Sequence, residues 1–141
     1  MILGRLLEDA TTNVLKIGID GTNERHKAIA NNIANVDTPK YQRASVEFEE
    51  QLKRAINHSG LIGRRTHPAH FIIGGPEEIN MVRPRVDIDH LTRFRADKNN
   101  INIDQEMADL AENTQKNVQF TEMLTRRYSS IKQVISEAGR A

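Results

Sequence analysis

A heptad repeat in the last third of the chain constrains its fold more than any other sequence feature. From residue 103 onward, side chains alternate at spacings of four and three: Ile103, Met107, Leu110, Thr114, Asn117, Thr121, Leu124, Tyr128, Ile131 and Ile135. A stripe of this period, held over several heptads, is typical of a coiled-coil helix. One such helix is not stable with its stripe in water, so the sequence predicts that it pairs with another helix.

The ends of the repeat carry residues that start and stop helices. Asn102 can cap the first turn, and Gln105 stands three residues later in the capping-box position. Acidic residues gather in the first turns and basic residues toward the end, as the helix dipole favours. Gly139 then ends the pattern. The sequence predicts a C-terminal helix within residues 101–141, roughly 50 Å long at the usual rise per residue.

A second long helix is predicted near the start of the chain, from Leu3 to Val36. Alanines in its second half give good helix propensity and a slim profile. Gly18 and Gly21 each cost a helix roughly 1 kcal/mol relative to Ala, so we expect the part before Thr22 to be bent, or ordered only in an assembly. Pro39 stops the helix, because proline cannot continue the backbone hydrogen bonding.

Residues 40–100 read as a short helix followed by extended segments. Phe48, Leu52 and Ile56 recur at a spacing of four, which predicts a helix over Ser45–Asn57. Farther on, glycines and prolines punctuate two extended runs, which we interpret as a small β-hairpin or an irregular loop. These runs are His70–Ile73 and Ile79–Ile88.

Together these elements predict a mainly α fold. We expect long N- and C-terminal helices that pack as an antiparallel, coiled-coil-like pair, with a small irregular or β-hairpin middle segment. The chain of 141 residues is short enough for one elongated domain. Its predicted parts are an N-terminal helix and turn (1–39), the middle segment (40–100) and the C-terminal helix (101–141).

The composition limits the functions open to this chain. Its net charge is +1, from 20 basic and 19 acidic residues, so it lacks the basic excess that nucleic-acid binding needs. There is no cysteine, which excludes disulfides, thiolate metal sites and thiol catalysis. We find no signal peptide and no apolar run of the ~18 residues that a membrane span requires. We therefore expect a cytosolic protein, or one exported without a cleaved leader.

The middle segment offers the few residues that suggest chemistry. His67 and His70 have ligand-like spacing, and Asp87 or Asp89 would complete a zinc or iron site. A lone pair of histidines is a weak motif, however, and no His-Glu-x-x-His pattern accompanies it. The sequence also contains no phosphate-binding glycine loop and no nucleophile elbow. We expect no enzyme activity, no metal, no cofactor and no small-molecule substrate.

Polar residues interrupt both predicted helix seams. Thr114 and Asn117 stand where a simple zipper would carry Leu or Ile, and Asn31, Asn32 and Asn35 lie near the end of the first helix. Such groups either lie on a partly solvated face, with the asparagines capping a helix end, or fix register and partner choice in a seam. One capping Asn is ordinary, but three favour the second interpretation.

Two segments resemble the signatures of a known family. Ala30-Asn-Asn-Ile-Ala-Asn-Val-Asp-Thr-Pro-Lys-Tyr41 is similar to the N-terminal signature of flagellar rod and hook proteins. The segment from Asn99 to Asn113 is similar to the C-terminal signature of the proximal rod proteins, the shortest members. Lys40 and Lys98 stand where members often carry Gly, so a Lys there is strained if its φ is positive.

The resemblance implies a structural role. In this family the terminal helices pack into a layer that lines an export channel, and the subunits stack helically into a hollow rod in the periplasm. The implied partners are copies of the chain, other rod proteins, and the membrane ring and export apparatus at the rod base. Export would follow the flagellar type III route, without a cleaved signal peptide. The competing hypothesis is a cytosolic helical adaptor or secretion chaperone that binds through its heptad face.

On the rod hypothesis, the subunit interfaces use residues of both seams and of the turn between them. The polar members would set register, and the turn residues would redirect the chain outward, with Tyr41 packed on the helices. The predicted interface residues are Ile29, Asn31, Asn32, Ile33, Asn35, Val36, Thr38, Pro39, Tyr41, Met107, Leu110, Thr114, Asn117, Leu124, Tyr128 and Ile131.

Overall fold

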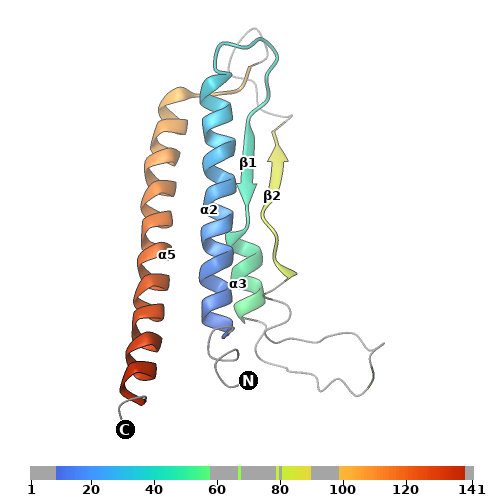
Figure 1. The fold of residues 1–141 in the computed structure, drawn as a ribbon. Coiled ribbons are helices and arrows are strands. Elements are labelled where there is room, and N and C mark those ends of the chain that lie inside the picture. The colour runs from blue at the N-terminus through green and yellow to red at the C-terminus, as the bar shows by residue number, and fades with distance from the viewer. Residues whose placement is uncertain (1–8, 58–66, 68–78, 80, 90–98, 139–141) are drawn as a thin grey trace.

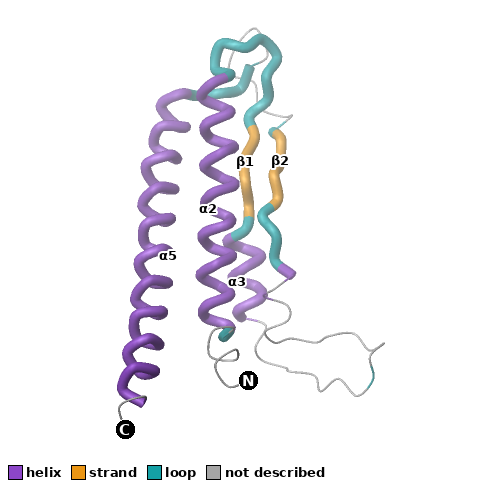
Figure 2. The backbone as a smooth tube through the Cα atoms, in the orientation of Figure 1, coloured by secondary structure: helices purple, strands orange, loops and turns teal. Residues whose placement is uncertain are grey.

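The computed structural model describes residues 9–57, 67, 79, 81–89 and 99–138. Its elements follow in the order α2 (Ala10–Ala34), β1 (Ala44–Glu47), α3 (Glu49–Asn57), β2 (Arg85–Ile88) and α5 (Ile103–Ala138). Helix α2 lies in the middle, with α5 along one side and the strands and α3 along the other (Figures 1 and 2). No helix among the described residues is long and apolar enough to span a membrane.

Helices α2 and α5 run antiparallel along their common length (Figure 1). Residues late in α2 contact residues early in α5, and residues at the start of α2 contact residues late in α5. Asn32 bonds to Glu106, Thr22 to Asn113, and Asp9, just before α2, to Arg127. The predicted fold class, two long terminal helices packed on each other around a small β-structured middle, is confirmed.

The expectation that glycines bend the first helix is wrong. Helix α2 is continuous over 25 residues, and both glycines lie on its buried face. A Cβ on Gly18 would stand 3.0 Å from the Phe120 ring, and one on Gly21 would stand 2.6 Å from the Phe48 ring. The glycines therefore let two aromatic rings lie against the helix backbone, which offsets their poor helix propensity.

The predicted helix over Ser45–Asn57 is wrong in its first part. Ala44–Glu47 forms strand β1, and α3 begins only at Glu49. Phe48 is completely buried, and its carbonyl accepts the first helical hydrogen bond, from the Leu52 N–H. The spacing of four that suggested a helix thus belongs to α3 and the residue that precedes it.

The predicted hairpin has a different partner strand. β2, within the run 79–88, pairs antiparallel with β1, so that Val86 lies opposite Val46 and Ile88 opposite Ala44. The run 70–73 lies outside the described residues. A bond from the Asp89 N–H to the Arg43 carbonyl extends the ladder by one pair.

Two small apolar clusters fix this layer on α2. Phe48, Val46 and Ala28 form one of them. The other, at the α3 end, contains Ile17, Leu52, Ile79 and Val82. The strands and α3 thus cover one face of α2 and leave its other face to α5.

The caps of the long helices follow the sequence in part. The Asn102 side chain accepts from the N–H groups of Asp104 and Gln105, so it caps α5 as predicted. The Gln105 amide donates to Asp109. The end of α5 at Gly139 lies outside the described residues. Helix α5 has 36 residues, which corresponds to about 54 Å.

Candidate assembly surface

Two series of residues on α5, each with a spacing of seven, face different surroundings. Glu106, Asn113 and Phe120 contact α2, and Arg127 bonds to Asp9, the residue that precedes α2. The next residues along the chain, Met107, Thr114, Thr121 and Tyr128, are exposed together with Ile103 and Ile135. The side chain of Met107 is 54% exposed and that of Ile135 47%. We call this exposed set the outer stripe of α5.

The predicted seam therefore divides between the interior and the surface of the chain. Leu110, Asn117, Leu124 and Ile131 are half-buried beside the contacts with α2, whereas Met107, Thr114 and Tyr128 belong to the outer stripe. On α2 and the turn, Ile29 and Asn32 are buried. Ile33, Asn35, Val36 and Tyr41 are half-buried, and Asn31, Thr38 and Pro39 are exposed.

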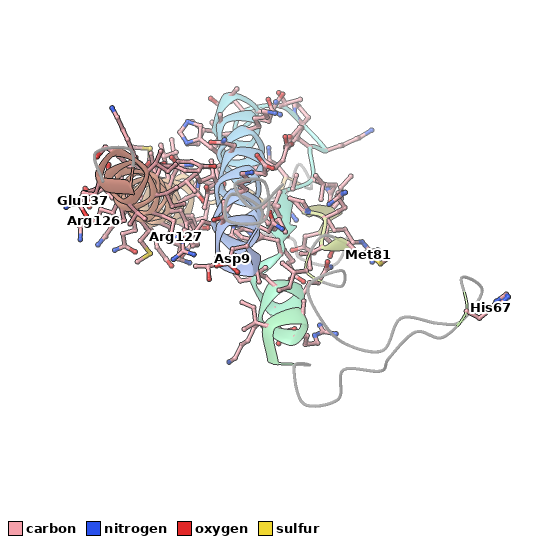
Figure 3. The ribbon with its side chains drawn as sticks, turned by 60° about the horizontal axis from the view of Figure 1, so that its bottom comes forward. Asp9, His67, Met81, Arg126, Arg127 and Glu137 are labelled. Atoms are coloured by element: carbon pink, nitrogen blue, oxygen red, sulfur yellow. The ribbon has the colours of Figure 1, made fainter. Side chains whose placement is uncertain are left out.

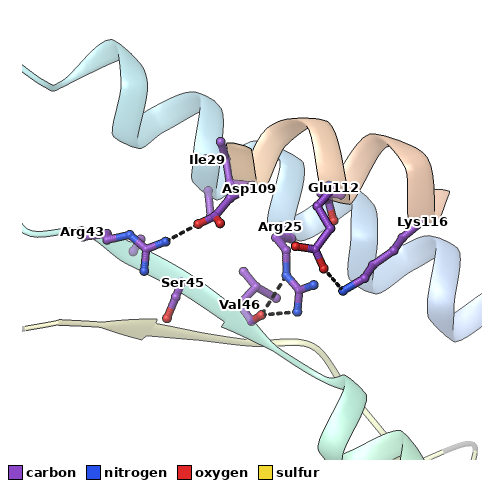
Figure 4. Close-up of a pocket in the computed structure, with 11 residues that line it drawn as sticks. Arg25, Ile29, Arg43, Ser45, Val46, Asp109, Glu112 and Lys116 are labelled. Atoms are coloured by element: carbon purple, nitrogen blue, oxygen red, sulfur yellow. Dashed lines mark hydrogen bonds and ion pairs between the residues drawn. The ribbon is translucent and has the colours of Figure 1, made fainter. Parts of the chain in front are cut away.

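Buried charges and amides join α2, β1 and α5 near one end of the helix pair. The Asn32 amide donates to the Ala44 carbonyl and to Glu106 Oε2, and its oxygen accepts from the Ala44 N–H. Glu106 is fully buried and pairs with Arg43, which also binds Asp109 at 2.8 Å (Figure 4). We call these residues (Asn32, Arg43, Glu106 and Asp109) the Asn32–Glu106 cluster. It satisfies the hydrogen-bonding groups that burial would otherwise make costly.

Two adjacent asparagines before α5 hold the neighbouring turns. The Asn99 amide donates to the carbonyls of Asn35, Val36 and Thr38 at 2.9–3.1 Å, so it holds the C-cap residue of α2 and the turn that follows the helix. The Asn100 oxygen accepts from the Arg43 N–H, and its amide donates to the Asp89 carbonyl. Both side chains are buried, so the start of α5 is fixed to the end of α2 and to the sheet.

Midway along the pair, the seam between α2 and α5 is polar again. Asn113 donates to the Thr22 carbonyl at 2.9 Å, and Asn117 donates to the Thr22 hydroxyl and to Asn23 Oδ1. Asn117 was predicted to set register between subunits. In this structure its amide is engaged within one chain, across the α2–α5 seam.

A network of ion pairs connects α2, α3 and α5. Arg25 binds Glu49 with two hydrogen bonds of 2.7 and 2.6 Å and also donates to the Val46 carbonyl. Lys116 pairs with both Glu49 and Glu112. These hydrogen bonds, above all the one from Arg25, lower the pKa of Glu49 from 4.5 to about 2. The pKa of Arg25 is raised, chiefly by its hydrogen bond to Glu49.

A cleft of about 180 Å³ lies between β1 and α5, beside these ion pairs (Figure 4). Its charged lining residues, Arg25, Arg43, Asp109, Glu112 and Lys116, bind one another or Glu49. The charged lining residues therefore connect α2, α5 and the segment around β1 and α3 to one another.

The candidate metal ligands do not come together where the structure describes them. His67 is exposed and lies far from the helices (Figure 3), Asp87 is exposed on β2, and His70 falls outside the described residues. Within the described residues, no group of three His, Cys, Asp or Glu side chains can hold a metal ion.

The apolar spacing in the sequence did not identify the residues that form the seam between α2 and α5. Glu106, Asn113 and Arg127 each precede a predicted seam residue by one position. Because they are polar, a search for apolar spacing does not select them. Together with Phe120 they recur at a spacing of seven, which was the available signal. Arg43, Asn99 and Asn100 bind through contacts between residues far apart in sequence, which no local pattern indicates.

Comparison with known proteins identifies relatives along most of the chain. Residues 23–42, which include the end of α2 and the following turn, match the sequence model described as flagella basal body rod protein. A flagellar basal body rod protein FlgB from Borrelia hermsii is 34% identical over 125 residues, which cover 83% of this chain and 89% of the relative. The protein of that name from Bacillus subtilis is 27% identical, over 92% of this chain and 96% of the relative.

Proposed function

The chain belongs to the flagellar basal body rod protein family, and we propose that it polymerises through its terminal helices into the hollow shaft of the proximal rod. Family membership makes it a structural, non-catalytic component of the flagellar basal body, needed for motility. The finer proposal concerns how the subunits join. Neighbouring subunits cover the surfaces of α2 and α5 that a single chain leaves exposed.

The outer stripe of α5 carries this proposal. Its apolar members, Ile103, Met107, Tyr128 and Ile135, are each more than a third exposed, although they stand at positions of the heptad pattern of one helix. Apolar side chains at this period pack against another helix when one is available. α2 already occupies the adjacent face, through Glu106 and Asn113. A helix of a neighbouring subunit is therefore the fitting partner for the stripe.

The form of the assembly follows from the position of this surface. In the proposed rod the stripe meets a different surface of the neighbour, and such a heterologous contact repeats along a helix instead of closing into a dimer. The slender α2–α5 pair then forms the inner layer around an export channel. The predicted interface residues on the α2 end and its turn, Asn31, Thr38 and Pro39, are exposed and free to meet neighbours.

The further partners and the location belong to the same proposal. Other rod proteins would adjoin this chain, and the membrane ring and export apparatus would contact the rod base. The rod would lie in the periplasm, reached through the flagellar type III route without a cleaved signal peptide. A closed complex with a single client, as an adaptor or chaperone would form, leaves unexplained why the relatives are rod proteins.

A charge placed in the outer stripe tests the proposal. Met107→Asp leaves the unfolding midpoint of the purified chain unchanged, because the side chain is exposed, but it abolishes motility in cells that lack the wild-type chain. The matched control is Gln119→Asp, at an exposed polar position of the same helix. Normal swimming of the Met107→Asp strain would overturn the proposed packing.

A further inference from the structure

The turn between α2 and β1 holds a lysine in a backbone conformation that suits glycine. Lys40 has a φ of 64°, in the left-handed region. The Tyr41 N–H donates to the Thr38 carbonyl across the turn, with Pro39 as its second residue. Proline at the second position and a positive φ at the third define a type II turn, whose third residue is normally Gly or Asn. A lysine at this position is strained.

Hydrogen bonds around the turn impose this conformation from outside. Asn99 donates to the Thr38 carbonyl at 2.9 Å, and the Thr38 hydroxyl donates to Asn35 Oδ1. The Thr38 N–H also donates to the Asn35 carbonyl. These bonds hold Thr38 before residue 40, and the Tyr41 N–H bond to the Thr38 carbonyl closes the turn after it. None of them involves the side chain of residue 40, so the choice of lysine does not shape the turn.

The Lys40 side chain makes no contact within the described part of the chain that would offset the strain of its backbone. Lys40 is exposed, like Asp37, Thr38 and Pro39 before it. Its ammonium makes no hydrogen bond or ion pair to another described residue, whereas Arg43, close by in sequence, binds Glu106 and Asp109. Backbone strain without a local benefit is typical of sites where the side chain serves a function.

We infer that Lys40 is a contact residue for a carboxylate of a neighbouring subunit in the rod. The ammonium is a compact cation whose strongest partner is a carboxylate acceptor. Lys40 is exposed in the turn that follows α2, and it takes no part in the ion pairs between the described layers of the chain. This inference rests on the proposed function, because it needs a neighbour in contact with the turn.

Substitutions at Lys40 separate strain from contact. Lys40→Gly relieves the strain and raises the ratio of folded to unfolded chain about fivefold or more. It also removes the cation, so the number of rod-containing basal bodies falls severalfold. Lys40→Gln gives the same assembly loss without the gain in stability. Lys40→Arg retains assembly, and Lys40→Glu assembles worse than Lys40→Gln because like charges repel.

The experiment places each variant in cells that lack the chromosomal copy, counts rod-containing basal bodies, and measures unfolding of the purified chains. Lys53→Gln, at an exposed lysine of α3, is the matched control and assembles like the wild type. The inference is overturned if Lys40→Gly and Lys40→Gln assemble normally, if Lys40→Glu matches Lys40→Gln, or if Lys40→Gly is no more stable. Rod formation without any copy of the chain would instead overturn the proposed function.

Discussion

Asn32 and Glu106 lie 74 positions apart in sequence and are joined by a hydrogen bond of 3.0 Å in the interior of the helix pair. Both side chains are completely buried. Asn32 also bonds both backbone groups of Ala44, so one side chain connects α2, β1 and α5. Because buried polar groups are costly without their partners, this contact fixes the register of the two helices.

Removal of the Glu106 charge tests this connection. Glu106→Gln is expected to destabilise the chain by about 3 kcal/mol, because Arg43 loses a buried ionic partner and faces an amide donor. The unfolding free energy from urea titration measures the effect. Glu122→Gln, at an exposed position of α5, serves as the control and leaves the midpoint unchanged. An equally small effect at Glu106 would show that the buried pair does not hold the helices together.

The hydrogen bonds by which Asn99 holds the turn after α2 give a second prediction. Asn99→Ala is expected to cost about 2 kcal/mol, because the carbonyls of Asn35, Val36 and Thr38 lose a buried donor. Asn102→Ala, which removes the exposed cap of α5, is expected to cost only about 1 kcal/mol. Equilibrium unfolding of the two variants gives the comparison. The reverse order of the two effects would contradict the role of Asn99.

The close approach of Phe48 to Gly21 gives a third prediction. Gly21→Ala is expected to destabilise the chain by about 1–3 kcal/mol, because the new methyl group overlaps the ring, although alanine favours helices. In Gly21→Ala/Phe48→Leu the smaller side chain makes room, so the double variant loses less stability than the sum of the single variants. Strictly additive losses in thermal unfolding would show that the two residues do not compete for space.

The ion pair of Glu49 predicts a dependence of stability on pH. The pKa of Glu49 is lowered to about 2 in the folded chain, so its contribution is complete above its ordinary pKa and is lost as the pH falls toward 2. The side chain is 44% exposed, and solvent screening reduces the contribution to about 1 kcal/mol. Glu49→Gln is therefore less stable than the wild type at pH 7, and the difference shrinks between pH 5 and pH 2. A difference that stays constant over this range would contradict the pairing.

The sequence was sufficient to predict the two long helices and their pairing. The heptad spacing defined α5, and Asn102 and Pro39 marked the start of one helix and the stop of the other. These signals are local, and each depends on backbone rules that hold wherever the segment lies. Strand β1 could not be predicted in the same way. Its extended conformation depends on pairing with Arg85–Ile88, some 40 residues later, and on the packing of Phe48 against Gly21.

The candidate surface was predicted only in part, for a related reason. Apolar periodicity marks residues that a helix buries somewhere, but it does not say whether the partner is in the same chain. The structure assigns Glu106 and Asn113 to the internal seam and leaves Met107 and Tyr128 outside. A chain that assembles can keep an apolar stripe on its surface and a polar seam between its own helices, because neighbouring subunits bury the apolar stripe.

Chemical labelling of Met107→Cys tests the central claim most directly, since the native chain has no cysteine to interfere. The thiol at this position reacts readily with a maleimide in the free chain, because Met107 is exposed there. If neighbouring subunits cover the outer stripe, the same thiol is protected in isolated basal bodies, whereas Gln119→Cys stays reactive. A Met107→Cys thiol that reacts equally fast in the free chain and in basal bodies would contradict the account.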